Sequence, residues 1–182
     1  SVGFPTTFVR LTGCPLRCQY CDTTYAFHGG EWWTLEQVLA RVAELDTRHV
    51  CVTGGEPLAQ KGARALLGAL CDTGRVVSLE TSGAIGYHDV DPRVVRVVDV
   101  KTPGSGEESR NLYDQLDGLR AADQVKFVIT SRADYDWSRG LLATRRLDAR
   151  TRLRAIDGRR VHQQYVLDAV HAPEQADDGE KY

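Results

Sequence analysis

Strand-like apolar runs alternate along this chain with amphipathic segments, and this order limits its possible folds more than any other feature. Runs rich in β-branched and aromatic residues predict strands over residues 6–11, 49–53, 75–80, 94–100 and 125–130. Leucine and valine spacing predicts helices over residues 34–45, 63–72, 112–122 and 135–147. Strands that alternate with helices form a parallel sheet with crossover connections. The chain has 182 residues, and a closed eight-stranded barrel takes about 250. We therefore expect an α/β fold with a mostly parallel sheet that forms an open, partial β/α barrel.

Composition places the chain among ordinary globular proteins. Hydrophobic residues make up 42% and charged residues 26%, which suits one domain with a core. The net charge of −2 gives no basic footprint for nucleic acid, and no apolar run is long enough to span a bilayer. An odd count of five cysteines, with Cys51 and Cys71 expected as small core residues, argues against a secreted disulfide framework. We expect a cytoplasmic protein without nucleic-acid or membrane partners.

Three cysteines in one loop are the strongest chemical signal. Cys14-Pro-Leu-Arg-Cys18-Gln-Tyr-Cys21 directly follows the first predicted strand. Thiolates hold iron–sulfur clusters and other soft metals. Three thiolates would leave one iron of a four-iron cluster open to a ligand that is not protein, which indicates chemistry at the cluster. A zinc site with His28 as the fourth ligand stays open as an alternative.

Polar residues also follow the other predicted strands. In parallel α/β folds these strand ends meet at one edge. Thr53-Gly54-Gly55-Glu56 follows the second strand, and its glycines would let the backbone approach a small polar ligand. Glu80 and Lys101 end the third and fourth strands, and Lys126 lies within the fifth. The simpler interpretations are a plain turn at the glycines and a mutual salt bridge between Glu80 and Lys101.

These motifs resemble those of a known enzyme group. The cysteine spacing, with Tyr20 before the last cysteine, resembles the cluster motif of the radical S-adenosylmethionine (SAM) superfamily. Gly54-Gly55-Glu56-Pro57 resembles its second motif, which holds the methionyl amine. Within the superfamily, residues 2–150 are most similar to the 7-carboxy-7-deazaguanine synthase family. The likeness is carried by Phe8-Val-Arg10-Leu-Thr-Gly-Cys14, Cys21-Asp22-Thr23, Val52-Thr53-Gly54-Gly55-Glu56-Pro57, Leu79-Glu80-Thr81-Ser82-Gly83 and Val98-Asp99-Val100-Lys101-Thr102-Pro103-Gly104.

The resemblance implies a fold of the radical SAM type and a lyase activity. The family converts 6-carboxy-5,6,7,8-tetrahydropterin to 7-carboxy-7-deazaguanine with loss of ammonia, in the biosynthesis of queuosine and other 7-deazapurines. It implies a 4Fe–4S cluster whose open iron is chelated by SAM, together with magnesium (Mg²⁺). It also implies a pterin substrate, a flavodoxin-like or other reductant, and a homodimer.

The resemblance further implies roles for individual residues. Cys14, Cys18 and Cys21 would hold the cluster. Thr23 would bind Mg²⁺ through its hydroxyl, and Arg10 and Thr53 would bind the substrate. The SAM-binding set would be Tyr20, Cys21, Asp22, Gly55, Glu56, Glu80, Ser82, Asp99, Val100 and Lys101.

Both ends of the chain depart from the family pattern. A Gln-Gly-Glu element usually precedes the position of Ser1, and a basic Gln-x-His-Lys motif usually lies near the end. We therefore expect a radical SAM core over residues 1–150 without its N-terminal substrate segment, and a divergent or truncated segment over residues 151–182. In that segment His162, Gln163 and Gln164 receive no role. A glycyl-radical-enzyme activase and an inactive cluster-binding fragment or metal-binding module stay open as alternatives.

Overall fold

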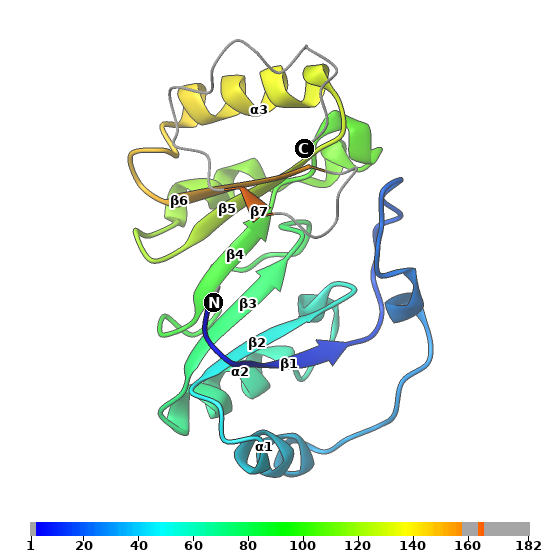
Figure 1. Cartoon of the computed structure of the whole chain (residues 1–182), viewed down its shortest axis with the longest axis vertical. Coiled ribbons are helices and arrows are strands. Elements are labelled where there is room, and N and C mark those ends of the chain that lie inside the picture. Colours follow the sequence, from blue (N-terminus) through cyan, green and yellow to red (C-terminus); the bar gives the residue numbers. More distant parts are fainter. Residues whose placement is uncertain (1–2, 158–163, 166–182) are drawn as a thin grey trace.

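The strands of the protein form one open sheet in chain order (Figure 1). The structure is a computed structural model and describes residues 3–157 and 164–165. The strands are β1 (Thr6–Leu11), β2 (His49–Gly54), β3 (Val76–Thr81), β4 (Val95–Asp99), β5 (Gln124–Ile129), β6 (Arg152–Asp157) and β7 (Gln164–Tyr165). Strands β1 to β6 pair in parallel, and β7 runs antiparallel to β6. Within these described residues β1 and β7 are the two edges of the sheet, so the predicted partial barrel is confirmed.

The first five strands lie where the sequence predicts them, and β6 and β7 are additions. Residues 152–155 alternate between polar and apolar side chains, and this period of two is the signal that could have revealed a further strand. The sheet thus continues past residue 150, and the expected division of the chain there stays a prediction. Of the residues left without a role, Gln164 begins β7, whereas His162 and Gln163 lie outside the described residues.

Three of the four predicted helices are confirmed. They are α1 (Leu35–Glu44), α2 (Ala63–Asp72) and α3 (Arg132–Arg145). A capping box begins α1, where Thr34 Oγ1 accepts from the Gln37 N–H at 3.2 Å and Gln37 Oε1 accepts from the Thr34 N–H at 2.7 Å. Helix α3 starts earlier than expected because the Ser131 side chain caps it by accepting from the Asp134 N–H.

The predicted helix over residues 112–122 was wrong. A short 3₁₀ segment, Tyr113–Gly118, stands in its place and ends at Leu119 in extended backbone. Tertiary hydrogen bonds compete with the helix here, because Gln115 Oε1 accepts from the Tyr87 N–H at 2.7 Å and Asp123 Oδ1 accepts from the Arg96 N–H of β4 at 2.9 Å. Both bonds fix the segment as a loop against β4 and its neighbours.

The two faces of the sheet have different surroundings because strand side chains alternate. On β2, Val50 and Val52 are fully buried in the hydrophobic core together with Leu67 and Leu70 of α2. Burial of each such side chain contributes roughly 1.5–3 kcal/mol. The alternate residues of the strands face the concave side, where the cavities lie. No helix in the described part of the chain is both long and apolar enough to cross a bilayer.

Candidate active site

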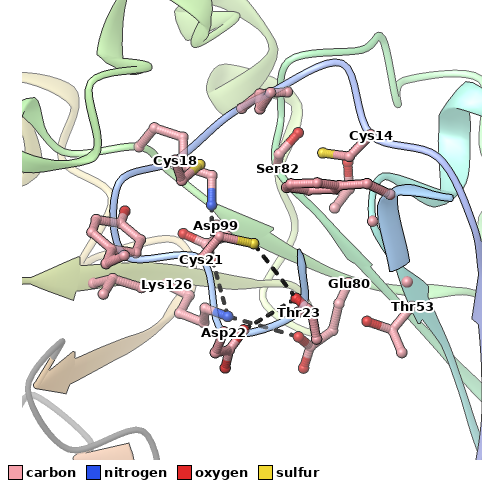
Figure 2. A pocket seen from close by; sticks show the side chains of 18 of the residues that line it. Cys14, Cys18, Cys21, Asp22, Thr23, Thr53, Glu80, Ser82, Asp99 and Lys126 are labelled. Carbon is pink, nitrogen blue, oxygen red and sulfur yellow. Dashed lines mark hydrogen bonds and ion pairs between the residues drawn. The ribbon is translucent and has the colours of Figure 1, made fainter. Parts of the chain in front are cut away.

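A cavity of about 260 Å³ lies on the concave face, at the carboxyl ends of the strands. Successive strands each contribute one inward-facing polar side chain to its wall, as Figure 2 shows in part. These are Arg10 on β1, Thr53 on β2, Glu80 on β3, Asp99 on β4 and Lys126 on β5. The structure therefore brings together the strand-end residues that the sequence singled out.

The three cysteines of the loop surround this cavity (Figure 2). Cys14, Cys18 and Cys21 are all free thiols. The loop that carries them is fixed to the rest of the fold by backbone hydrogen bonds, among them Gly13 N–H to Ala26 O at 2.8 Å and Gln19 N–H to Ser105 O at 3.0 Å. The thiols therefore line the cavity because the loop docks on the segment that follows β4.

The arrangement of the thiols favours a cluster over a zinc ion. Among residues 3–157 and 164–165, no three His, Cys, Asp or Glu side chains converge on a single metal ion. A tetrahedral zinc site needs its ligands within about 2.3 Å of one centre. His28, the candidate fourth ligand, is exposed and does not belong to the cavity wall. Three thiols that line one cavity suit the thiolate ligation of an iron–sulfur cluster.

Burial sets the protonation of two of these thiols. It raises the pKa of Cys14 and Cys18, and the Lys101 ammonium opposes the increase in both cases. Thiols with raised pKa values are protonated near neutral pH, and metal ligands must be thiolates. Binding of iron at these residues would therefore release protons.

The glycines after β2 allow the two loops of the site to pack closely. A Cβ atom on Gly55 would lie 2.9 Å from the Cys14 Cβ and closer still to the Gly13 carbonyl oxygen. Gly54 has a φ of 149°, which side chains rarely tolerate. The Gly55 N–H donates to Leu11 O at 3.1 Å, and the Glu56 N–H donates to Gly13 O at 2.8 Å. Gly54-Gly55-Glu56 is therefore not a plain turn, because its backbone hydrogen bonds position the cysteine loop.

Glu56 lies behind the cavity wall and is fully buried. Its carboxylate accepts from the Leu58 N–H at 3.0 Å, the Thr81 hydroxyl at 2.9 Å, and the Ser82 N–H and hydroxyl at 2.7 and 2.5 Å. These bonds hold the loop after β2 to the end of β3. Val100 is also a core residue, 2% exposed, and not part of the wall. Contact of these two side chains with SAM stays a prediction.

An ion network forms one side of the cavity. Asp99 Oδ2 lies 3.0 Å from Lys126 Nζ and 3.2 Å from Lys101 Nζ (Figure 2 labels Asp99 and Lys126). Glu80 pairs with Lys126, at 3.7 Å, rather than with Lys101. Burial disfavours the ionised form of Asp99, but the two ammonium groups more than offset it and lower its pKa. The resemblance assigns no role to Lys126, and strand alternation along β5 is the signal that places it in the cavity wall.

Two polar atoms of the site lack a partner. Asp99 Oδ1 and the Tyr20 hydroxyl are buried, and neither has a hydrogen-bond partner among the described residues. Both residues line the cavity. Buried polar atoms are nearly always paired, so the open Asp99 Oδ1 atom indicates a ligand that completes its hydrogen bonds. Three soft thiol donors, a glycine-lined wall and this open oxygen together fit a 4Fe–4S cluster with SAM beside it.

The remaining candidate residues lie on the same wall. The Thr23 hydroxyl donates to Asp22 Oδ1 at 3.1 Å, so two oxygen-bearing side chains stand together. The Arg10 guanidinium lies 5.7 Å from the centre of the Tyr25 ring. Ser82 also lines the cavity although its hydroxyl donates to Glu56. Every residue named for cofactor or substrate except Glu56 and Val100 therefore reaches the cavity.

Comparison with known proteins supports this assignment. The profile of the radical SAM superfamily matches residues 8–97. The 7-carboxy-7-deazaguanine synthase of Chlorobaculum tepidum is 44% identical over 78% of this chain and 66% of its own length. That of Clostridium acetobutylicum is 30% identical, and the match covers 83% of this chain and 72% of that protein. The chain spans 58% to 66% of the lengths of its relatives from C. tepidum, Koribacter versatilis and Methanospirillum hungatei.

Solved structures agree with the sequence comparison. The crystal structure of QueE from Escherichia coli superposes with a TM-score of 0.60 at 25% identity, covering 78% of this chain and 69% of that one. Streptococcus suis SuiB bound to S-adenosylmethionine superposes with a TM-score of 0.62 at 15% identity, covering 85% of this chain and 41% of that one, and shows the shared fold alone. The fold, the cysteine-lined cavity and these relatives place the chain in the 7-carboxy-7-deazaguanine synthase family of the radical SAM superfamily.

Proposed function

We propose that this protein is a radical SAM lyase that converts 6-carboxy-5,6,7,8-tetrahydropterin to 7-carboxy-7-deazaguanine with loss of ammonia. The observation that carries the proposal is the single cavity in which three thiols, a glycine-lined wall and one polar side chain from each of five strands meet. Membership of the family supplies the substrate and the product.

Cys14, Cys18 and Cys21 would hold the cluster, and SAM would occupy its open iron. Bound there, the pair supplies the one-electron chemistry that removes a hydrogen atom from the substrate, which no protein side chain supplies unaided. Asp99 Oδ1, a buried acceptor without a partner, is suited to a hydroxyl or amine of SAM. The ammonium groups beside Asp99 keep it ionised and therefore able only to accept.

Substrate and Mg²⁺ would lie toward β1 and β2. The planar Arg10 guanidinium can grip a carboxylate with two parallel hydrogen bonds. Thr53 lies beside it, because Arg10 and Thr53 are register partners across β1 and β2. The Thr23 hydroxyl offers the kind of hard oxygen ligand that Mg²⁺ prefers, and Asp22 beside it would contact SAM. The protein would thus orient the pterin by its charged end.

The finer features of the family are part of the same proposal. They are a radical SAM core over residues 1–150, a homodimer, a flavodoxin-like reductant, a cytoplasmic location and a place in queuosine biosynthesis. They rest on the resemblance of the sequence motifs to the family.

Product analysis tests the proposal. The anaerobically reconstituted protein is incubated with the carboxytetrahydropterin, SAM, Mg²⁺ and dithionite, and the products are identified by mass. We expect 7-carboxy-7-deazaguanine and 5′-deoxyadenosine from the wild type. Arg10→Gln should lose the deazaguanine, while Arg93→Gln, which changes an exposed arginine paired with Asp91, should keep it. Deoxyadenosine without any deazaguanine from the wild type would contradict the proposed substrate.

A further inference from the structure

A second cavity, of about 520 Å³, lies on the concave face below the first, toward the amino ends of the strands. Phe8 and Glu80 line both cavities, so the two spaces adjoin at these side chains. Phe8 is two residues before Arg10 on β1 and therefore points to the same face of the sheet. Arg10, which would bind a carboxylate, therefore lies next to the larger, second cavity.

Phe8 leaves its ring uncovered at this junction. It lies in the middle of a strand but is 63% exposed, whereas its register partner Cys51 on β2 is 5% exposed. An uncovered aromatic ring inside a concave site is a surface for stacking a planar ligand. The Cα atoms of Phe8 and Arg10 are about 7 Å apart along the strand. A planar molecule that carries a carboxylate on one ring can therefore reach both side chains.

Gln124 supplies a polar group in the lower cavity. It faces inward from β5, and its Oε1 atom is buried without a hydrogen-bond partner among the described residues. A buried amide oxygen without a partner is suited to accept a hydrogen bond from an N–H donor of a ligand. A pterin has such donors on the edge of its ring, in the 2-amino group and at N3. The lower cavity therefore offers both a stacking surface and an acceptor to a fused, nitrogen-rich ring.

We propose that Phe8 is a specificity-determining residue of the substrate site. The Phe8 ring stacks against the bicyclic ring of the pterin. Arg10 binds the carboxylate, and Gln124 accepts a hydrogen bond from the edge of the pterin ring. This inference rests on the proposed function and extends it into the lower cavity.

Equilibrium binding of 6-carboxypterin, a fluorescent analogue that is not turned over, tests the inference. The cluster-loaded protein with SAM bound is titrated anaerobically, and the quenching of pterin fluorescence gives the affinity. Loss of one stacked ring weakens binding about tenfold to a hundredfold, so Phe8→Ala should show this loss and Phe8→Tyr should recover most of it. Gln124→Leu should weaken binding about two- to tenfold. Trp32→Ala, which removes an aromatic ring that is 97% exposed and lines neither cavity, should bind like the wild type.

The affinity for SAM, measured in the same samples, separates a local effect from a folding defect. We expect SAM affinity within about twofold of the wild type in Phe8→Ala. If the wild type binds 6-carboxypterin and Phe8→Ala binds it equally well, the role of Phe8 is refuted while the proposed function stands. If SAM and pterin affinities fall together in both Phe8→Ala and Phe8→Tyr, Phe8 supports the fold and the inference is also overturned. If the wild type binds no pterin, the proposed function fails and the inference fails with it.

Discussion

Substitution of Glu56 by glutamine should destabilise the protein strongly although the side chain does not line the cavity. Its two carboxylate oxygens serve two backbone N–H groups from different loops, with Oε1 accepting from Leu58 and Oε2 from Ser82. A glutamine amide has one oxygen, so in Glu56→Gln one of these buried N–H groups would face an NH₂ group. A lost hydrogen bond to a charged group costs about 1.5–3 kcal/mol, and an unsatisfied buried donor costs a similar amount. We expect a loss of about 2–4 kcal/mol.

Thermal unfolding of the reduced apoprotein, followed by circular dichroism, measures this effect. For a chain of this size each kcal/mol lowers the melting temperature by roughly 2–4 °C, so Glu56→Gln should melt about 4–16 °C below the wild type. Glu44→Gln is the matched control, because the Glu44 side chain is 63% exposed in a surface pair with Arg41. Such pairs contribute about 0–1 kcal/mol. A melting temperature for Glu56→Gln equal to that of Glu44→Gln would refute the reasoning.

Two further predictions concern the loops and the acid stability. Gly55→Ala should lower both the melting temperature and the iron content after reconstitution, because the new Cβ would clash with the cysteine loop. Gly62→Ala is the control, because a Cβ at Gly62 meets open space, and it should keep both values. Equal iron content in the two variants would contradict this prediction. Buried Asp123 has a pKa held below its usual range, because Arg120 and Arg96 more than offset its burial. Its contribution to stability is present above the ordinary aspartate pKa and lost as the pH falls through the lowered value. Denaturant unfolding should therefore show Asp123→Asn less stable than the wild type at pH 7 and less sensitive to acid between pH 5 and 2; parallel pH profiles would count against it.

The fold was predictable wherever local patterns agree with the tertiary structure. The β-branched runs, the spacing of the leucines and valines, and the Thr34 capping box are local signals. They predict five of the strands and three helices of the structure. The segment over residues 112–122 has helical spacing, but the bonds of Gln115 and Asp123 to distant partners decide it. The sequence predicts β6 only weakly, because its alternation covers just residues 152–155 and Ile156 is its single β-branched residue.

The candidate site was predictable in its membership but not in its geometry. Topology alone brings the ends of parallel strands together, so Arg10, Glu80 and Lys101 meet at one cavity as expected. Sequence spacing cannot tell a side chain that faces the ligand from one that supports the wall. Glu56 belongs to the second kind, because its carboxylate is filled by four neighbouring donors. Lys126 lines the cavity instead, and only the register of β4 with β5 pairs it with Asp99.

The most direct test of the central claim is the electron paramagnetic resonance spectrum of the reconstituted, reduced protein with and without SAM. The claim is that the three thiols form a site for a 4Fe–4S cluster with an iron open to SAM, and it depends only on described residues. We predict a signal of a reduced 4Fe–4S cluster that changes on addition of SAM and is lost in Cys14→Ser, Cys18→Ser and Cys21→Ser, but not in Cys71→Ser. A signal that does not change on addition of SAM would contradict the account. So would a signal that is retained in each of the three loop variants.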